Sequence, residues 1–121
     1  MKNTRIDYLY RDADNYKRNN TVIVRGEITE ALKQAIMNSL FDGDGHFIPE
    51  QLDLPIKRPG DTLTSADHCF CELTADDFTL TDEAPTDPRT ISNLATDFVQ
   101  AAYDGWDVAG YAVVVADEEV L

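Results

Sequence analysis

Apolar and polar positions alternate near the start of the chain, and this pattern predicts two strands. The first covers residues 4–10, where Ile6, Tyr8 and Tyr10 alternate with positions that are polar apart from Leu9. A polar stretch over 11–20 predicts a turn region, and the β-branched run TVIVRGEI predicts a second strand over 21–28. We expect the two strands to pair as an antiparallel hairpin with a long loop.

A helical pattern follows directly. Apolar residues recur at helical spacing over 30–41 and form one apolar face. Thr29 precedes the pattern as a plausible N-cap, and Glu30 places a negative charge in the first turn, where the helix dipole favours it. Either Gly43 or Gly45 is expected to end this helix.

A second helix is predicted over residues 89–103, where apolar residues again recur at helical spacing. Asp87 followed by Pro88 resembles an N-cap with proline at the first helical position, and Thr90 is an alternative cap. Gly105 is expected to stop the helix.

The rest of the chain predicts further strands and long connections. We expect a short strand over 46–48, a strand over 67–73, and a strand covered on both faces over the nearly continuous apolar run 108–116. Residues 52–66 and 74–88 lack periodicity and read as long loops.

This order of elements indicates the α+β class. We expect a single domain over residues 1–121, with a mixed or antiparallel sheet and two α-helices packed on one face. The length of 121 residues and the apolar fraction of 43% suit one compact domain.

Charge is distributed unevenly along the sequence. The 23 acidic and 10 basic side chains give a net charge of −13. Residues 1–60 carry nine of each sign, whereas residues 61–121 carry fourteen carboxylates and one basic residue, Arg89. This excess argues against direct nucleic-acid binding, which needs clustered Lys and Arg.

The acidic half, residues 61–121, suggests a surface for a basic protein partner, although solubility alone is the simpler explanation. Complementary charge would mainly speed association with such a partner. The candidate partner-binding residues are Asp76, Asp77, Asp82, Glu83, Asp87 and Trp106. Trp106 lies between two aspartates after a helix end, where it can anchor a partner or cap the edge of the core.

We therefore expect a non-catalytic protein-interaction module. One alternative is a DNA mimic that inhibits a nucleic-acid-binding protein, which would require a line of carboxylates on one surface. Another alternative is an enzyme with an unrecognised site, for which the hypothesis expects a pocket around His46 or His68.

The sequence motifs that come closest to a metal site do not match the required ligand patterns. The run FDGDGHFIPEQL (41–52) resembles a calcium loop, but neither register places oxygen ligands, glycine and glutamate at the required positions. On a strand, His68 would face away from Cys69 and Cys71, so the two thiols are expected to pack as small apolar groups. We expect no metal and no cofactor.

The sequence also predicts the cellular compartment of the protein. The residues after Met1 lack the apolar run of a secretory signal, and the longest apolar stretch, Tyr111 to Ala116, is far too short for a membrane span. Two cysteines give no disulfide framework, so both are expected to be reduced in a cytoplasmic protein.

One resemblance agrees with this location. IDYLYRDADNYKRNN followed by VIVRGEITEALKQAI resembles small proteins of gut Firmicute bacteria and their mobile elements. The resemblance implies a bacterial cytosolic protein, but it assigns neither an activity nor any site residue.

Overall fold

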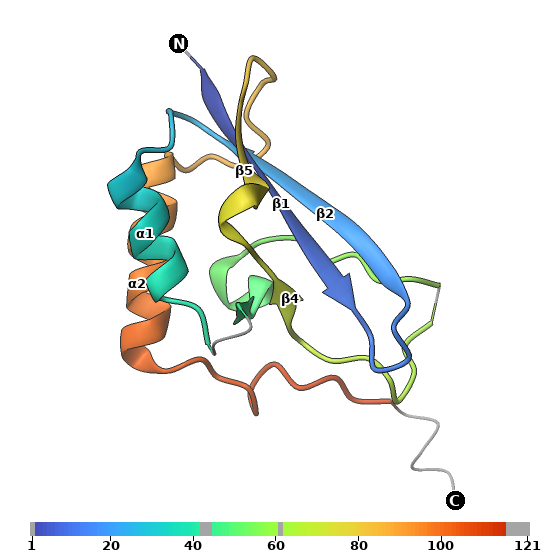
Figure 1. Cartoon of the computed structure of the whole chain (residues 1–121). Helices are drawn as coiled ribbons and strands as arrows, with labels where there is room; N and C mark the ends of the chain where they lie inside the picture. The colour runs from blue at the N-terminus through green and yellow to red at the C-terminus, as the bar shows by residue number, and fades with distance from the viewer. Residues whose placement is uncertain (1, 42–44, 61, 116–121) are drawn as a thin grey trace, which may run out of the picture.

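A five-stranded antiparallel sheet and two helices form the fold (Figure 1). The computed structural model describes residues 2–41, 45–60 and 62–115. The α+β class and the antiparallel sheet are confirmed. The two helices pack together and both contribute side chains to the core.

The hairpin at the start of the chain is confirmed, with longer strands than the sequence predicts. Strand β1 (Asn3–Arg11) pairs antiparallel with β2 (Lys17–Val24) in a register that runs from Thr4–Val24 to Arg11–Lys17. The polar residues at the start of β2 extend the ladder with exposed side chains, so apolar alternation alone does not reveal them.

The other edge of β1 is shared by two short strands. β5 (Phe78–Thr81) pairs with the first half of β1, and β4 (Cys71–Glu72) pairs with it at Leu9. β3 (His46–Phe47), which the sequence predicts, then pairs with β4, so the main order is β2-β1-β4-β3.

Two sequence predictions for this region are wrong. The expected loop 74–88 contains β5, preceded by a short 3-10 helix, η2 (Ala75–Asp77). The expected strand 67–73 pairs only over Cys71–Glu72. Only one of the four side chains of β5, Phe78, is buried, so this strand carries almost no apolar pattern and depends on backbone pairing with β1.

Both helices form close to their predicted positions. α1 (Glu30–Asn38) is capped by Thr29, whose side chain accepts a hydrogen bond from the amide of Leu32 at 3.2 Å. The helix ends at Ser39, earlier than expected, because the Ser39 amide turns back to the carbonyls of Ile36 and Met37. Of the two expected stops, Gly45 lies well beyond this end, and Gly43 lies outside the described residues.

The start of α2 (Ile91–Asp104) corrects a prediction. Thr90 is the N-cap, accepting from the amide of Asn93 at 3.1 Å, whereas Asp87 lies outside the helix. Gly105 follows the last turn as expected, in the left-handed region at φ +88°.

The core lies between the sheet and the helices. Alternate residues of β1 face it, so the tyrosines that produce the sequence pattern are almost fully buried. Tyr8 contacts Phe47 edge-on with ring centroids 5.5 Å apart, and Phe47 contacts Phe98 of α2 at 5.3 Å. These aromatic contacts join the sheet to α2.

The expected strand over 108–116 is wrong for every residue of it that the structure describes. Residues 108–111 form a turn and residues 112–115 belong to no helix or strand, and Val114 is 71% exposed. Residue 116 lies outside the described part. The apolar composition indicated burial, but the core of this chain is already filled by other elements.

Candidate functional site: an acidic groove beside the second helix

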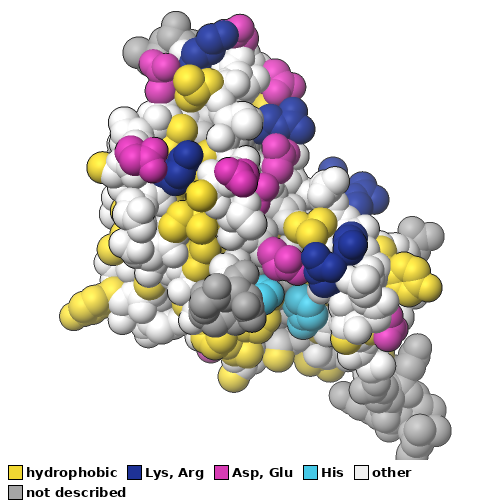
Figure 2. Space-filling view, in the orientation of Figure 1, with side chains coloured by type: hydrophobic (Ala, Val, Ile, Leu, Met, Phe, Trp, Pro, Cys, Tyr) yellow, Lys and Arg dark blue, Asp and Glu magenta, His cyan; other side chains and the backbone are white. Residues whose placement is uncertain are grey.

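Ion pairs join the acidic half of the sequence to the balanced half. Lys2 pairs with Asp82 at 2.7 Å, and Arg11 pairs with Glu72 at 2.9 Å. Glu83 accepts from Arg5 at 3.3 Å. The surface in Figure 2 accordingly shows basic and acidic side chains next to one another. The charge asymmetry of the sequence is therefore partly cancelled in space.

Asp87, one of the candidate partner residues, pairs with Arg89 within the acidic half, in the least exposed ion pair of the described residues. It is 9% exposed, and its two oxygens accept from Nε and Nη2 of Arg89 at 2.9 and 2.7 Å. The hydrogen bond from Arg89 holds the pKa of the Asp87 carboxyl below its ordinary value despite partial burial. Asp87 therefore positions Arg89 and offers little free charge to a partner.

The remaining candidates fall at separate places. Asp77 closes a capping box in η2, where its carboxylate accepts from the amide of Thr74 at 2.8 Å, and its neighbour Asp76 is exposed. Trp106 is half-buried, donates from Nε1 to the Ser39 carbonyl at 2.9 Å, and contacts Phe98 edge-on. Trp106 thus caps the core edge, and a role for these residues in partner binding stays a prediction.

The two cysteines are buried, and His68 is hydrogen-bonded to the backbone. Both thiols are free and buried, and burial raises the pKa of Cys71 to about 12. His68 accepts from the Phe70 amide at Nδ1, so its Nε2 carries the proton and donates to the Arg11 carbonyl at 2.6 Å. A buried protonated thiol and a histidine with both nitrogens occupied are poorly suited to nucleophilic catalysis.

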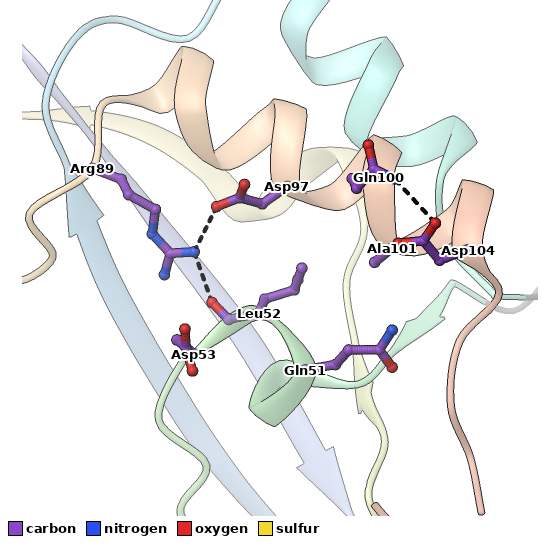
Figure 3. A pocket seen from close by; sticks show the side chains of 8 residues that line it. All are labelled: Gln51, Leu52, Asp53, Arg89, Asp97, Gln100, Ala101 and Asp104. Carbon is purple, nitrogen blue, oxygen red and sulfur yellow. Dashed lines mark hydrogen bonds and ion pairs between the residues drawn. The ribbon is translucent and has the colours of Figure 1, made fainter. Parts of the chain in front are cut away.

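A different group of carboxylates converges on one hollow, which we call the acidic groove. It lies between α2 and η1 (Pro49–Leu52), a 3-10 helix that follows β3, and has a volume of about 310 Å³. Figure 3 shows the side chains that line it. They are Gln51, Leu52, Asp53, Arg89, Asp97, Gln100, Ala101 and Asp104.

Two helical turns of α2 place the carboxylates along one wall. Asp97 and Asp104 are seven residues apart and therefore lie on the same side of the helix, with Gln100 between them. Gln100 donates to Asp104 at 3.0 Å. Asp53 stands on the opposite wall in the left-handed conformation (φ 55°), which aspartate tolerates better than most residues.

Arg89 fixes the floor of the groove. Its Nη1 donates to the Leu52 carbonyl at 2.7 Å and to Asp97 at 3.0 Å, which ties η1 to α2 (Figure 3). The hydrogen bond to Asp87 is the largest of the effects that raise the pKa of Arg89 above its already high value. The guanidinium stays charged and is committed to three partners, so Asp53 and Asp104 retain negative charge for another ligand.

Sequence reasoning missed this groove. Asp53 lies in the balanced half and Asp104 in the acidic half, so neither charge counting nor motif spacing connects them. The i, i+3 and i+7 placement of Asp97, Gln100 and Asp104 on a predicted helix was the one available signal. Asp53 could be added only once η1 was known to pack against α2.

Comparisons with models of protein families, with curated proteins and with solved structures found no match to this chain. In the described part of the structure, no helix is long and apolar enough to cross a membrane. Over the same residues, no three or more His, Cys, Asp or Glu side chains come together as a metal site would require. The residues Asp42, Gly43 and Asp44 of the calcium-like motif lie outside the described part.

Proposed function

We propose that this protein is a non-catalytic binding module that takes a basic segment of a partner protein into the acidic groove. The observation that carries the proposal is the convergence of Asp53, Asp97 and Asp104 on one hollow in which Arg89 is already fully engaged. The resemblance described above would place this partner in the bacterial cytoplasm.

The groove has the chemistry of a site for Lys or Arg side chains. Three carboxylates against one arginine leave a net negative charge, and the carboxamides of Gln51 and Gln100 add neutral hydrogen-bonding groups. A guanidinium can donate two parallel hydrogen bonds to one carboxylate, which favours arginine over lysine. Because η1 and α2 are regular elements tied together by Arg89, the groove is preorganised for binding.

The two alternatives have less support. A DNA mimic needs a continuous line of free carboxylates, whereas Glu72, Asp82 and Glu83 are paired with basic residues. The enzyme alternative expects a pocket around His46 or His68, and both histidines line a hollow of about 170 Å³ together with Phe41 and Phe70. Both ring nitrogens of His68 are already hydrogen-bonded to the backbone, and no carboxylate or thiol of the described residues lines this hollow.

A basic peptide tests the proposal. We expect an acetylated and amidated hexa-arginine peptide to bind the full chain at low salt, measured by calorimetry, and to shift the amide NMR signals of α2 and η1. The double substitution Asp53→Asn and Asp104→Asn should weaken this binding by about 3- to 10-fold, since each exposed pair contributes up to about 1 kcal/mol.

The matched control removes the same charge elsewhere. Asp14 and Asp76 are exposed and do not line the groove, so Asp14→Asn with Asp76→Asn changes the net charge equally. This variant should bind the peptide with nearly the affinity of the unsubstituted chain. Equal weakening by both double variants would show that only net charge attracts the peptide and would overturn the assignment of the groove.

A further inference from the structure

We infer that the acidic groove recognises an arginine residue of a peptide chain through two contacts of opposite polarity. Asp53 and Asp104 accept from its guanidinium, and the carboxamide of Gln51 donates to a main-chain carbonyl of the same peptide. This inference rests on the proposed function and adds to it a hydrogen-bond donor that selects a peptide among cationic ligands. Its basis is the set of hydrogen bonds that the groove side chains already make.

The carboxamide of Gln51 is oriented by the chain that follows α2. The backbone amide of Asp107 meets Gln51 Oε1 at 2.8 Å. Because a backbone N–H can only donate, this contact uses the carboxamide oxygen and leaves the Nε2 group as the available end. Within the described residues, no hydrogen bond uses the Nε2 protons. In Figure 3 the nitrogen of Gln51 lies on the side of α2, where the carboxylate wall stands.

The amide that orients Gln51 is itself held in place. Trp106, the residue before Asp107, donates from Nε1 to the Ser39 carbonyl at 2.9 Å. The Asp107 carboxylate accepts from the amide of Gly110 at 2.9 Å, and its carbonyl accepts from the amide of Tyr111 at 3.2 Å. The turn that begins at Asp107 therefore fixes the Gln51 donor before any ligand arrives, which lowers the cost of ordering it on binding.

The carboxylates of the groove supply the opposite polarity. Asp104 accepts from Gln100 at Oδ1 and keeps Oδ2 for another donor. Within the part of the chain that the structure describes, no hydrogen bond or ion pair reaches the side-chain oxygens of Asp53. Acceptors for a cation thus stand on both walls, and the Gln51 donor stands on the η1 wall beside Asp53.

A peptide arginine satisfies both polarities in one ligand. A polyamine or a metal ion would neutralise the carboxylates but would leave the Gln51 donor without an acceptor. A phosphate or carboxylate ligand could accept from Gln51, but the aspartates of the groove would repel it. The groove volume of about 310 Å³ lies at the lower end of the range for ligand pockets, which suits one side chain with its adjoining backbone.

Two substitutions of Gln51 and two cationic probes test this inference. The probes are the hexa-arginine peptide described above and spermine, which is cationic but has no carbonyl. Gln51→Met keeps the net charge and removes the donors, so the peptide should bind the full chain about 3- to 10-fold more weakly by calorimetry. Spermine affinity should stay within about 2-fold, because spermine offers no acceptor to Gln51.

Gln51→Glu separates the donor from the charge. Glutamate keeps an oxygen for the Asp107 amide, so this variant tests the donors even where methionine disturbs the turn. The added carboxylate should tighten spermine binding by about 2- to 5-fold. The peptide loses its donor and meets a carboxylate at the carbonyl, so its affinity should fall at least about 5-fold relative to that of spermine.

Gln100→Glu is the charge-matched control on the α2 wall of the same groove. It leaves Gln51 intact and should tighten both probes by similar factors. Equal changes for peptide and spermine in both Gln51 variants would overturn this inference while leaving the proposed function standing. Peptide binding that ignores the double substitution Asp53→Asn and Asp104→Asn would overturn the proposed function and this inference with it.

Discussion

At the residue scale, Arg89 is the only basic side chain of residues 61–121 and joins three parts of the fold. It holds Asp87 in a two-pronged ion pair, Asp97 on α2, and the carbonyl of Leu52 at the end of η1. The side chains of Asp87 and Arg89 are only 8% and 18% exposed, so water can replace few of these bonds. The single positive charge is thus used inside the protein.

Arg89→Met should therefore be strongly destabilising. The substitution leaves the Asp87 carboxylate buried without its partner, and removing one member of a buried pair costs roughly 3 kcal/mol. We expect the free energy of unfolding, measured in urea by circular dichroism, to fall by about that amount. It should fall less in the double variant Asp87→Leu and Arg89→Met, where no buried carboxylate is left unpaired and only the more exposed Asp97 loses its ion-pair partner.

An exposed pair provides the comparison. Lys2 and Asp82 are joined at 2.7 Å, but their side chains are largely exposed, so Lys2→Gln should cost less than about 1 kcal/mol. Similar losses for Lys2→Gln and Arg89→Met would show that burial of the Asp87–Arg89 pair has little energetic importance.

At the element scale, the sequence predicts those elements that have their own apolar pattern. The β1 tyrosines, the apolar face of α1 and that of α2 each repeat with the period of the element, and all three elements form where expected. β5 and β4 have only four and two residues, and their positions depend on pairing with β1, which a local pattern cannot show. The acidic groove depends in the same way on η1 packing against α2.

The prediction of a strand that starts at residue 108 is wrong for the opposite reason. The apolar pattern there is strong, but a pattern shows only that a segment can be buried, not that the single chain has a free sheet edge or core space to receive it.

The junction of β3 with β4 depends on a glycine. Gly45 has φ +79°, and a Cβ there would lie 2.6 Å from the Leu73 carbonyl oxygen, which belongs to the backbone and cannot move aside alone. Gly45→Ala should lower the free energy of unfolding by about 3 kcal/mol, combining the left-handed conformation with the clash. Urea unfolding of the variant measures this loss.

Gly60 is the matched control for that substitution. It has nearly the same φ, +78°, but a Cβ there would meet nothing within 4 Å. Gly60→Ala should therefore lose only the conformational part, about 1 kcal/mol. If the two variants were equally stable, the close approach to Leu73 would not be the reason for the glycine.

At the scale of the whole molecule, several buried groups are held in one protonation state. Burial and the hydrogen bond to Asp67 raise the pKa of Tyr10 to about 12, and burial raises that of Cys71 to about 12. Burial also raises the pKa of Tyr8. On the acid side, Arg89 lowers the pKa of Asp87. Burial acts to raise the pKa of Asp67, but hydrogen bonds from Tyr10 and Thr64 together with the nearby charge of Arg58 lower that pKa overall.

Stability should consequently decline at both ends of the pH scale. Groups with a raised pKa in the folded state stabilise it fully below their unfolded values, 9.0 for cysteine and 10.0 for tyrosine, and this contribution is lost as pH rises to about 12. Groups with a lowered pKa stabilise the fold above their unfolded value of 3.8, and this is lost as pH falls below it. Urea midpoints between pH 2 and pH 12 should show a plateau near neutrality.

The chain's net charge of −13 also lowers stability at alkaline pH, because general repulsion grows as further groups ionise. Salt screens that repulsion but affects a buried tyrosine far less. Tyr10→Phe removes the ionisable group, so its urea midpoint should fall less steeply than that of the unsubstituted chain between pH 9 and pH 12. The difference in slope should persist in 0.5 M sodium chloride. Identical slopes would mean that repulsion alone causes the alkaline loss and that the Tyr10 hydroxyl does not contribute.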